Sequence, residues 1–146
     1  VDEKSLQAMK KALIDGEAVV KIVAPNLGKI KGNNGTLIDV DESFLTFSSV
    51  LFDALYFPSG LKAVKTLFEH MEPLNALDEA YRHCKPIALD EDALELWNAS
   101  YSSKELSKKA GPKELAVMGL IFNGSPKEFI KAIAKHRFWM REKKPS

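Results

Sequence analysis

Short apolar segments alternate with helical patterns along this chain, and that alternation restricts its fold more than any other feature. The segments are rich in β-branched, leucine or aromatic residues, and each ends at a proline or a polar residue: Ala18 to Ala24, Phe52 to Phe57, Lys85 to Leu89 and Val117 to Phe122. Apolar runs separated by helices are typical of parallel strands that are buried on both faces. The pattern therefore predicts an α/β fold, with a mainly parallel sheet covered by helices on both sides.

The spacing of apolar residues predicts the other elements. Gly28 to Val40 has the pattern of a β-hairpin, because Asn34-Gly35 is a strong turn signal and both residues tolerate positive φ. Ser100 to Gly111 is polar and rich in lysine and serine, which indicates a surface excursion. Apolar residues at helical spacing fall within five further segments. These are Ser5 to Asp15, Leu61 to Phe68, Pro73 to Tyr81, Ala93 to Leu96 and Ser125 to Phe138.

Two helix starts and one helix end carry specific signals. Ser5 is expected to cap the first helix, and Gly16 to stop it. Ser125-Pro126-Lys127-Glu128 has the spacing of a capping box with proline at the first helical position. These signals predict both ends of the first helix and the start of the last helix.

Composition limits the classes of partner. With 146 residues and a net charge of +1, the chain has the size of one domain, over residues 1–146, and lacks the excess charge of a nucleic-acid-binding protein. The basic tail residues Arg141, Lys143 and Lys144 are best interpreted as solvated. No apolar run is long enough to cross a membrane, and a single cysteine excludes an intrachain disulfide. We expect a cytoplasmic protein without nucleic-acid or membrane partners.

Any functional site should lie beyond the carboxyl ends of the parallel strands. Four loops occupy those positions: Ala24 to Leu27, Pro58 to Gly60, Leu89 to Asp92, and Phe122 to Ser125. The backbone N–H groups of Pro58-Ser59-Gly60 could hold an oxyanion or phosphate, but a tight turn with an N-cap is favoured. Asp90, Glu91 and Asp92 could bind a cation or act as a base, but helix capping is favoured.

The remaining reactive residue types do not form a recognisable site. Cys84 and the adjacent His83 precede the strand that ends at Leu89, and so lie at the end opposite the expected site. The three histidines, His70, His83 and His136, lack the spacing of a metal site. Tyr81, Trp97, Phe138 and Trp139 are expected to pack in the core. We therefore assign no catalytic, cofactor-binding or metal-binding residue to this chain.

Four blocks of sequence resemble a known family. The blocks are Gly28 to Thr36, Phe52 to Gly60, Glu79 to Ala88, and His136 to Trp139. Their order and spacing are similar to those in the C-terminal domain of large-subunit catalases, across nearly the whole chain. The resemblance implies a flavodoxin-like three-layer sandwich, related to class I glutamine amidotransferases and ThiJ/PfpI proteins, with the hairpin as an embellishment.

The resemblance also implies what the parent protein does. Such catalases dismutate hydrogen peroxide to water and oxygen at a buried haem, and the residues for that chemistry belong to the upstream catalase core. No cofactor is therefore expected in this chain. The expected partners are the catalase core and the other subunits of a homo-oligomer, a tetramer by resemblance. The domain itself would support stability or assembly.

Two departures from the wider superfamily are expected to matter. ThiJ/PfpI relatives place a reactive cysteine after the strand equivalent to Pro86 to Leu89, where this chain has Leu89 and Asp90. The turn Pro58 to Gly60 would then be the remnant of an oxyanion loop. Family members also begin with a central strand, whereas this chain starts at Val1, where that strand should end. We expect the strand to lie upstream, or another element or chain to fill its place.

Two other functions stay open at this point. A stand-alone ThiJ/PfpI-like hydrolase or chaperone is the main alternative, and a hydrolase would need a nucleophile and a base near residues 58–60 and 89–92. A flavodoxin-type module for a small ligand is the second, but its phosphate loop would follow the first strand, which this chain lacks.

Overall fold

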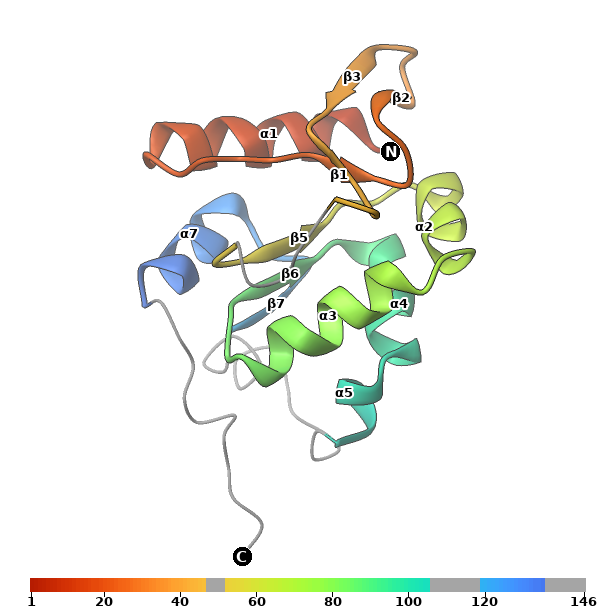
Figure 1. Cartoon of the computed structure of the whole chain (residues 1–146). Helices are drawn as coiled ribbons and strands as arrows, with labels where there is room; N and C mark the ends of the chain where they lie inside the picture. Colours follow the sequence, from red (N-terminus) through yellow and green to blue (C-terminus); the bar gives the residue numbers. More distant parts are fainter. Residues whose placement is uncertain (47–51, 106–118, 136–146) are drawn as a thin grey trace, which may run out of the picture.

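A three-stranded parallel sheet lies at the centre of the molecule. The computed structural model describes residues 1–46, 52–105 and 119–135. The strands β5 (Leu55–Phe57), β6 (Ile87–Leu89) and β7 (Leu120–Phe122) pair in the order β5-β6-β7. All three residues of β6 are buried. Because β6 has a paired strand on each edge and no exposed face, it is the centre of the fold (Figure 1).

Two helices cover one face of this sheet. They are α1 (Glu3–Asp15) and α7 (Pro126–Ala134), which contact each other. Met9 of α1 and Phe129 of α7 belong to one buried cluster with Ala88 of β6. The first and last helices of the described chain thus form one layer above the sheet (Figure 1).

The other face is covered by the helices from the middle of the chain. These are α2 (Leu61–Phe68), α3 (Glu72–Arg82), the 3₁₀ turn η2 (Glu91–Ala93) and α4 (Leu94–Ala99), with α5 (Tyr101–Glu105) beside them. No helix of the described ranges has the length and apolar character to cross a bilayer. The largest core cluster joins this layer to the sheet. Its buried members are Phe57, Val64, Leu77, Ala80, Tyr81, Ile87, Leu89, Ala93, Leu96, Trp97 and Leu120.

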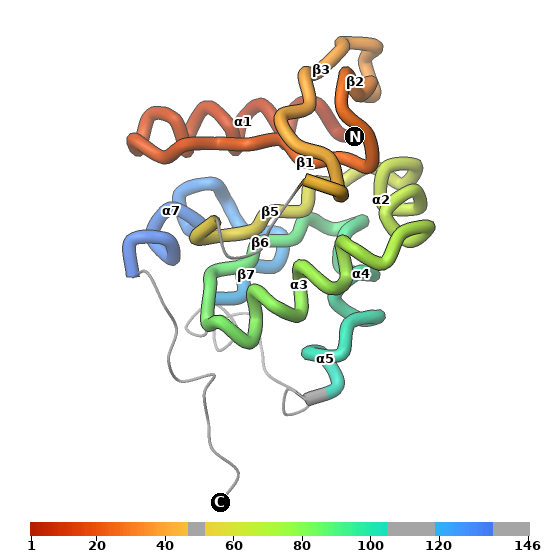
Figure 2. The backbone as a smooth tube through the Cα atoms, in the orientation of Figure 1, coloured from red at the N-terminus to blue at the C-terminus, as the bar shows by residue number. Residues whose placement is uncertain are grey.

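Two small sheets form a separate lobe near the start of α1. The strands β1 (Val23–Ala24) and β4 (Glu42–Ser43) pair in parallel, and β2 (Gly28–Lys31) and β3 (Leu37–Val40) form an antiparallel hairpin. Figure 2 shows the hairpin beside the amino-terminal end of α1. A third buried cluster of Leu6, Ile22 and Ile38 holds the lobe to α1.

The predicted three-layer α/β sandwich with a hairpin embellishment is confirmed, but one predicted strand is wrong. Ala18 to Ala24 was expected to be a buried strand, whereas only Val23 and Ala24 form β1 and Val19 is 87% exposed. Among the described residues, β1 pairs only with β4, and it lies outside the central sheet. Residues 18–22 precede β1 without strand pairing, so the apolar run overestimated the length of the strand.

The other strand predictions differ from the structure mainly in length. The hairpin is confirmed, although only Gly35 of its turn has a positive φ, of 89°, while Asn34 does not. The strands predicted at Phe52 to Phe57 and Lys85 to Leu89 shorten to β5 and β6. Of the last predicted strand, β7 is described, and residues 117–118 lie outside the described ranges.

Helix boundaries follow the capping signals, with one correction. Gly16 ends α1 as predicted, but Asp2, and not Ser5, caps its start. The Asp2 Oδ1 atom accepts a hydrogen bond from the Ser5 N–H at 3.3 Å. An aspartate at the N-cap position satisfies an N–H of the first helical turn in the same way as a serine does. The capping box of α7 is confirmed, since Ser125 and Glu128 each accept a hydrogen bond from the other's backbone N–H.

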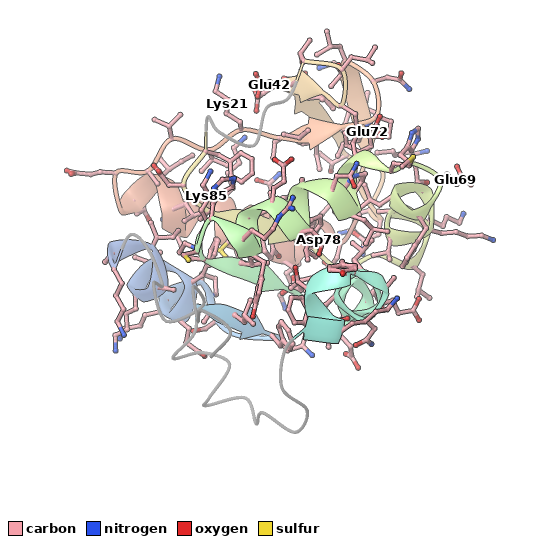
Figure 3. The ribbon with its side chains drawn as sticks, turned by 60° about the horizontal axis from the view of Figure 1, so that its bottom comes forward. Lys21, Glu42, Glu69, Glu72, Asp78 and Lys85 are labelled. Atoms are coloured by element: carbon pink, nitrogen blue, oxygen red, sulfur yellow. The ribbon has the colours of Figure 1, made fainter. Side chains whose placement is uncertain are left out.

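The polar segment predicted to be a surface excursion is partly buried. Ser100 and Ser102 are 1% and 2% exposed. The Oδ1 atom of Asp78 on α3 accepts hydrogen bonds from the N–H and the hydroxyl of Ser102 at 2.8 and 2.6 Å. The hydroxyl of Ser100 donates to the carbonyl of Trp97 at 2.6 Å. Figure 3 shows Asp78 on α3 beside α5. The prediction is therefore wrong for Ser100 and Ser102, whereas Tyr101 and Lys104 are exposed as expected; residues 106–111 lie outside the described ranges.

Residues 1–4 supply no central strand. Val1 and Asp2 belong to no strand, and α1 already begins at Glu3. Within the described ranges, β5 is an edge strand of the central sheet. The element that pairs with the outer edge of β5 stays a prediction.

The burial of β6 predicts that truncating its last side chain is costly. Leu89 is fully buried, so Leu89→Ala should lower the free energy of unfolding by about 2–5 kcal/mol, through lost transfer energy and the cavity left behind. Leu37→Ala is the matched control, since Leu37 is 61% exposed and its truncation should change stability by less than about 0.5 kcal/mol. Urea titrations of both variants measure the difference. Equal losses would contradict the placement of β6 at the core.

Candidate functional site

The carboxyl ends of the three central strands meet at one edge of the sheet. The N–H of Gly60, after β5, donates to Oδ2 of Asp92, after β6, at 2.9 Å. The N–H of Asn123, after β7, donates to the carbonyl of Leu89 at 2.9 Å. Three of the four loops predicted to build a site therefore meet. The fourth, Ala24 to Leu27, follows β1 in its separate sheet.

The turn of residues 58–60 presents its backbone N–H groups to carboxylates of the protein itself. Gly60 donates to Asp92, and the backbone of Ser59 hydrogen bonds to the carboxylate of Asp90. The hydroxyl of Ser59 in turn accepts the N–H of Asp92 at 3.3 Å. The expected tight turn is present, but α2 has no side-chain N-cap bond. The N–H groups that could have bound an oxyanion are satisfied by Asp90 and Asp92.

Asp90 does not cap the helix that follows it. It occupies the N-cap position of η2, but its side chain makes no capping hydrogen bond. Its Oδ2 atom instead accepts a hydrogen bond from the hydroxyl of Tyr56, on the neighbouring strand β5. The capping interpretation of Asp90 is therefore wrong. An aspartate at a strand end can reach across to the adjacent strand, and there it meets the phenol.

The partly buried Asp90 and Tyr56 have altered acidities. Burial raises the pKa of Asp90 above its usual range, and the negative charge of Asp2 raises it further, against the lowering effect of the Tyr56 and Ser59 hydrogen bonds. Burial also raises the pKa of Tyr56, and the adjacent Asp90 adds to that rise. The pair therefore retains protons more strongly than exposed groups of the same types.

Asp2 belongs to this edge, although sequence reasoning did not place it there. Its N–H donates to the carbonyl of Ser59 at 2.8 Å, which joins the start of α1 to the 58–60 turn. Tyr56 was also missed as a polar member of the site. Its position in an apolar run suggested a core aromatic, and no local spacing connects it with Asp90, 34 residues later.

This edge supplies carboxylates, a phenol and small turn residues, but no nucleophile with a partner base among the described residues. The position after β6 holds Asp90, as the sequence indicated. His70 packs its ring against Phe44, with centroids 5.3 Å apart, and His83 ends α3. The described side chains therefore form a hydrogen-bonded junction between strands.

Cys84 lies at the opposite end of β6, as predicted. It is fully buried and has a positive φ of 62°. Its Sγ atom lies 3.8 Å from the carbonyl oxygen of Arg82. A buried thiol in a turn is typical of a structural cysteine.

The other candidate residues also take structural positions where they are described. Tyr81 and Trp97 pack together, with ring centroids 5.7 Å apart, as expected. Among the described residues, no group of three or more potential ligands could hold a metal ion. Several predicted residues lie outside the described ranges. These are His136, Phe138, Trp139, Arg141, Lys143 and Lys144.

A small surface pocket lies between α3 and α5, away from the carboxyl edge. Its volume is about 200 Å³, below the roughly 300 Å³ at which small-molecule sites usually begin. Asp78 at its wall already accepts three hydrogen bonds from Tyr101 and Ser102. Each lining residue carries a polar or charged group. The lining consists of Asn75, Asp78, Glu79, Arg82, Tyr101 and Ser102.

Comparison with known sequences identifies close relatives. The profile of the C-terminal domain found in long catalases matches residues 1–143. Catalase-2 of Bacillus subtilis (strain 168) is 31% identical over 143 residues, which cover 95% of this chain and 19% of the relative. A catalase of Alkalihalophilus pseudofirmus is 33% identical over 121 residues, which cover 83% of this chain and 16% of the relative. The chain thus spans about a fifth or less of these relatives.

Comparison with solved structures identifies the fold. The VC2308 protein superposes with a TM-score of 0.70 at 15% identity, over 92% of this chain and 78% of that protein. A ThiJ/PfpI domain protein from Brachyspira murdochii gives 0.68 at 16% identity, over 91% of this chain and 86% of that protein. These likenesses show a flavodoxin-like fold of the ThiJ/PfpI type.

The raised pKa of Asp90 predicts a specific dependence of stability on pH. The folded protein binds this proton more tightly than the unfolded chain, where the pKa is near the ordinary 3.8. The contribution of Asp90 to stability should therefore rise as the pH falls through the folded pKa, and level off below 3.8. Relative to Asp90→Asn, the wild type should gain free energy of unfolding between about pH 7 and about pH 4.

Urea titrations across this pH range measure the gain. The matched control is Glu91→Gln, which changes the neighbouring, exposed carboxylate and should keep the wild-type profile. If wild type and Asp90→Asn differed by a constant amount at every pH, the assignment of a raised pKa would be wrong.

Proposed function

The chain belongs to the family of C-terminal domains found in long catalases, and from that premise we propose that it is a non-catalytic domain of a haem catalase. In this proposal it supports the stability or assembly of the parent enzyme, which dismutates hydrogen peroxide to water and oxygen. The main support for the proposal is that the backbone N–H groups of the 58–60 turn are already hydrogen-bonded within the protein. They bond to Asp90 and Asp92, so they are not available to stabilise a reaction intermediate.

The described residues do not fit a haem. A haem needs a large, mainly apolar cavity and an axial ligand that points into it. The pocket between α3 and α5 is too small for a haem, at about 200 Å³, and the buried Cys84 lies against the carbonyl of Arg82. We therefore assign the haem and all peroxide chemistry to the rest of the parent protein, and no cofactor to this domain.

In this proposal, assembly buries apolar side chains that the isolated domain exposes. Large apolar side chains that are exposed in the isolated domain can be buried against another part of the parent or against a neighbouring subunit. The proposed partners are the catalase core and the other subunits of a homo-oligomer, a tetramer, in the cytoplasm. The exposed apolar residues lie on several elements. They are Ile14, Val19, Leu27, Leu37, Leu45, Leu61, Phe68, Met71 and Tyr101.

The alternative function, a stand-alone ThiJ/PfpI-like hydrolase or chaperone, has less support. The fold is of that type, but a likeness of fold at 15% and 16% identity carries no activity. A hydrolase would need a nucleophile at the carboxyl edge. The described residues place Asp90 there, bonded to Tyr56.

A comparison of the parent enzyme with and without this domain tests the proposal. Removing the domain should leave the kcat for oxygen evolution unchanged, because no peroxide chemistry is assigned to it. The rate of thermal inactivation should rise by about tenfold, equivalent to roughly 1.4 kcal/mol of activation free energy. Oxygen-electrode assays after timed heating give both values.

The isolated 146-residue chain provides a second test of the proposal. It should neither evolve oxygen from peroxide nor give a Soret band after mixing with haem. Either activity would refute the proposal, and so would a truncated parent that resists heat as well as the intact enzyme.

A further inference from the structure

Two asparagines of this chain are each followed by a glycine, and the fold places them in different settings. They are Asn34, in the turn of the hairpin, and Asn123, directly after β7. Asparagine is a thermolabile residue. The backbone nitrogen of a following glycine can attack the asparagine side chain, because glycine has no Cβ atom to obstruct the approach. The dipeptide is the same at both positions, so a difference in reactivity must come from the fold.

The turn that contains Asn34 is open to solvent. Residues 33–36 are exposed, and a Cβ atom added at Gly35 would meet no atom within 4 Å beyond its chain neighbours. Gly35 has a positive φ of 89°, and its N–H donates to the carbonyl of Gly32 at 3.0 Å. This turn hydrogen bond must break before the Gly35 nitrogen can approach the Asn34 side chain. At an exposed loop tip such an opening costs little free energy.

Asn123 instead lies in a packed junction between β7 and α7. It has a positive φ of 53°, and its N–H donates to the carbonyl of Leu89 at 2.9 Å. A Cβ atom added at Gly124 would lie 2.2 Å from the Ile121 side chain and 3.2 Å from Oε2 of Glu128. Rotation of the backbone here would therefore displace part of the sheet or the capping box of α7.

We propose that Asn34 is a site of spontaneous deamidation, and that the fold protects Asn123 from the same reaction. In the first step, the Gly35 nitrogen bonds to Cγ of Asn34 and loses its proton, while the Cγ–Nδ2 bond breaks and ammonia leaves. Water then opens the cyclic imide. Cleavage between Cγ and the Gly35 nitrogen gives aspartate, and cleavage between the main-chain carbonyl carbon of residue 34 and that nitrogen gives isoaspartate. The net reaction converts an amide and water to a carboxylate and ammonium.

The new carboxylate would form in the segment that holds the hairpin to α1. The N–H of Asn34 donates to Oε2 of Glu3, a side chain that is only 6% exposed. The N–H of Glu3 in turn donates to Oδ1 of Asn33 at 3.1 Å. Gly32 permits this close contact, since a Cβ atom there would lie 1.9 Å from Cγ of Glu3. Figure 2 shows the hairpin beside the start of α1, where these bonds form.

Both products of the reaction should weaken this contact. A negative charge on residue 34 repels the carboxylate of Glu3, and isoaspartate also adds a methylene group to the backbone of the turn. The cluster of Leu6, Ile22 and Ile38 holds the lobe to α1 independently of the turn. We therefore expect the turn to separate from Glu3 while the rest of the lobe stays in place.

Peptide mapping of the 146-residue chain during incubation at mildly alkaline pH tests the proposed site. Mass spectrometry measures the replacement of amide by acid at each asparagine, and enzymatic methylation measures isoaspartate. In the folded chain, Asn34 should react at least about tenfold faster than Asn123, because its segment opens at lower free energy. In denaturing urea the two rates should become similar. Equal rates in the folded chain, or a faster reaction at Asn123, would overturn the proposal.

Asn34→Asp tests the effect of the reaction on the hairpin. The matched control is Asn34→Gln, which keeps an amide but has a longer side chain that disfavours cyclisation. Amide hydrogen exchange at Glu3 should be about two- to fivefold faster in the aspartate variant, the range expected for an exposed pair of charges. Exchange at Leu89 should be the same in both, because it reports on the central sheet. Equal exchange at Glu3 in the two variants would refute the expected separation of the turn from Glu3.

Discussion

The burial of β6 on both faces and both edges is the constraint on which the rest of the structure depends. Its side chains point alternately into the cluster beneath α2, α3 and α4 and into the cluster beneath α1 and α7. Neither helix layer has another surface of comparable size to cover. The two neighbouring strands take their register from β6, and the turns that follow them converge at one edge as a result.

At that edge, groups that could bind a ligand in a related fold form hydrogen bonds within the protein. The N–H groups of a turn at a helix start attract an anion, and here the anions are Asp90 and Asp92. An internal carboxylate pays no translational entropy on binding, so it competes effectively with dissolved ions. The same groups join β5, β6 and the start of α1 through Tyr56, Ser59 and Asp2.

Features that depend on neighbouring residues could be predicted from the sequence, and those that depend on distant ones could not. The capping box at Ser125 and the hairpin turn at Gly35 use groups a few residues apart. The burial of Ser102 depends on Asp78, 24 residues earlier, and the role of Asp90 depends on Tyr56, 34 residues earlier. Apolar content alone also failed at Val19, which lies outside β1 and is 87% exposed.

The core of the domain is divided into three clusters, and this division affects how the domain unfolds. In the described ranges, the lobe of β1, β2, β3 and β4 shares no strand pairing with the central sheet. Its small cluster is tied to the rest through α1, which also supplies Met9 to the cluster on the sheet. Sheets that share no ladder can open as separate cooperative units. The lobe can therefore open as a unit of its own while the central sheet stays folded, and α1 is the element that the two share.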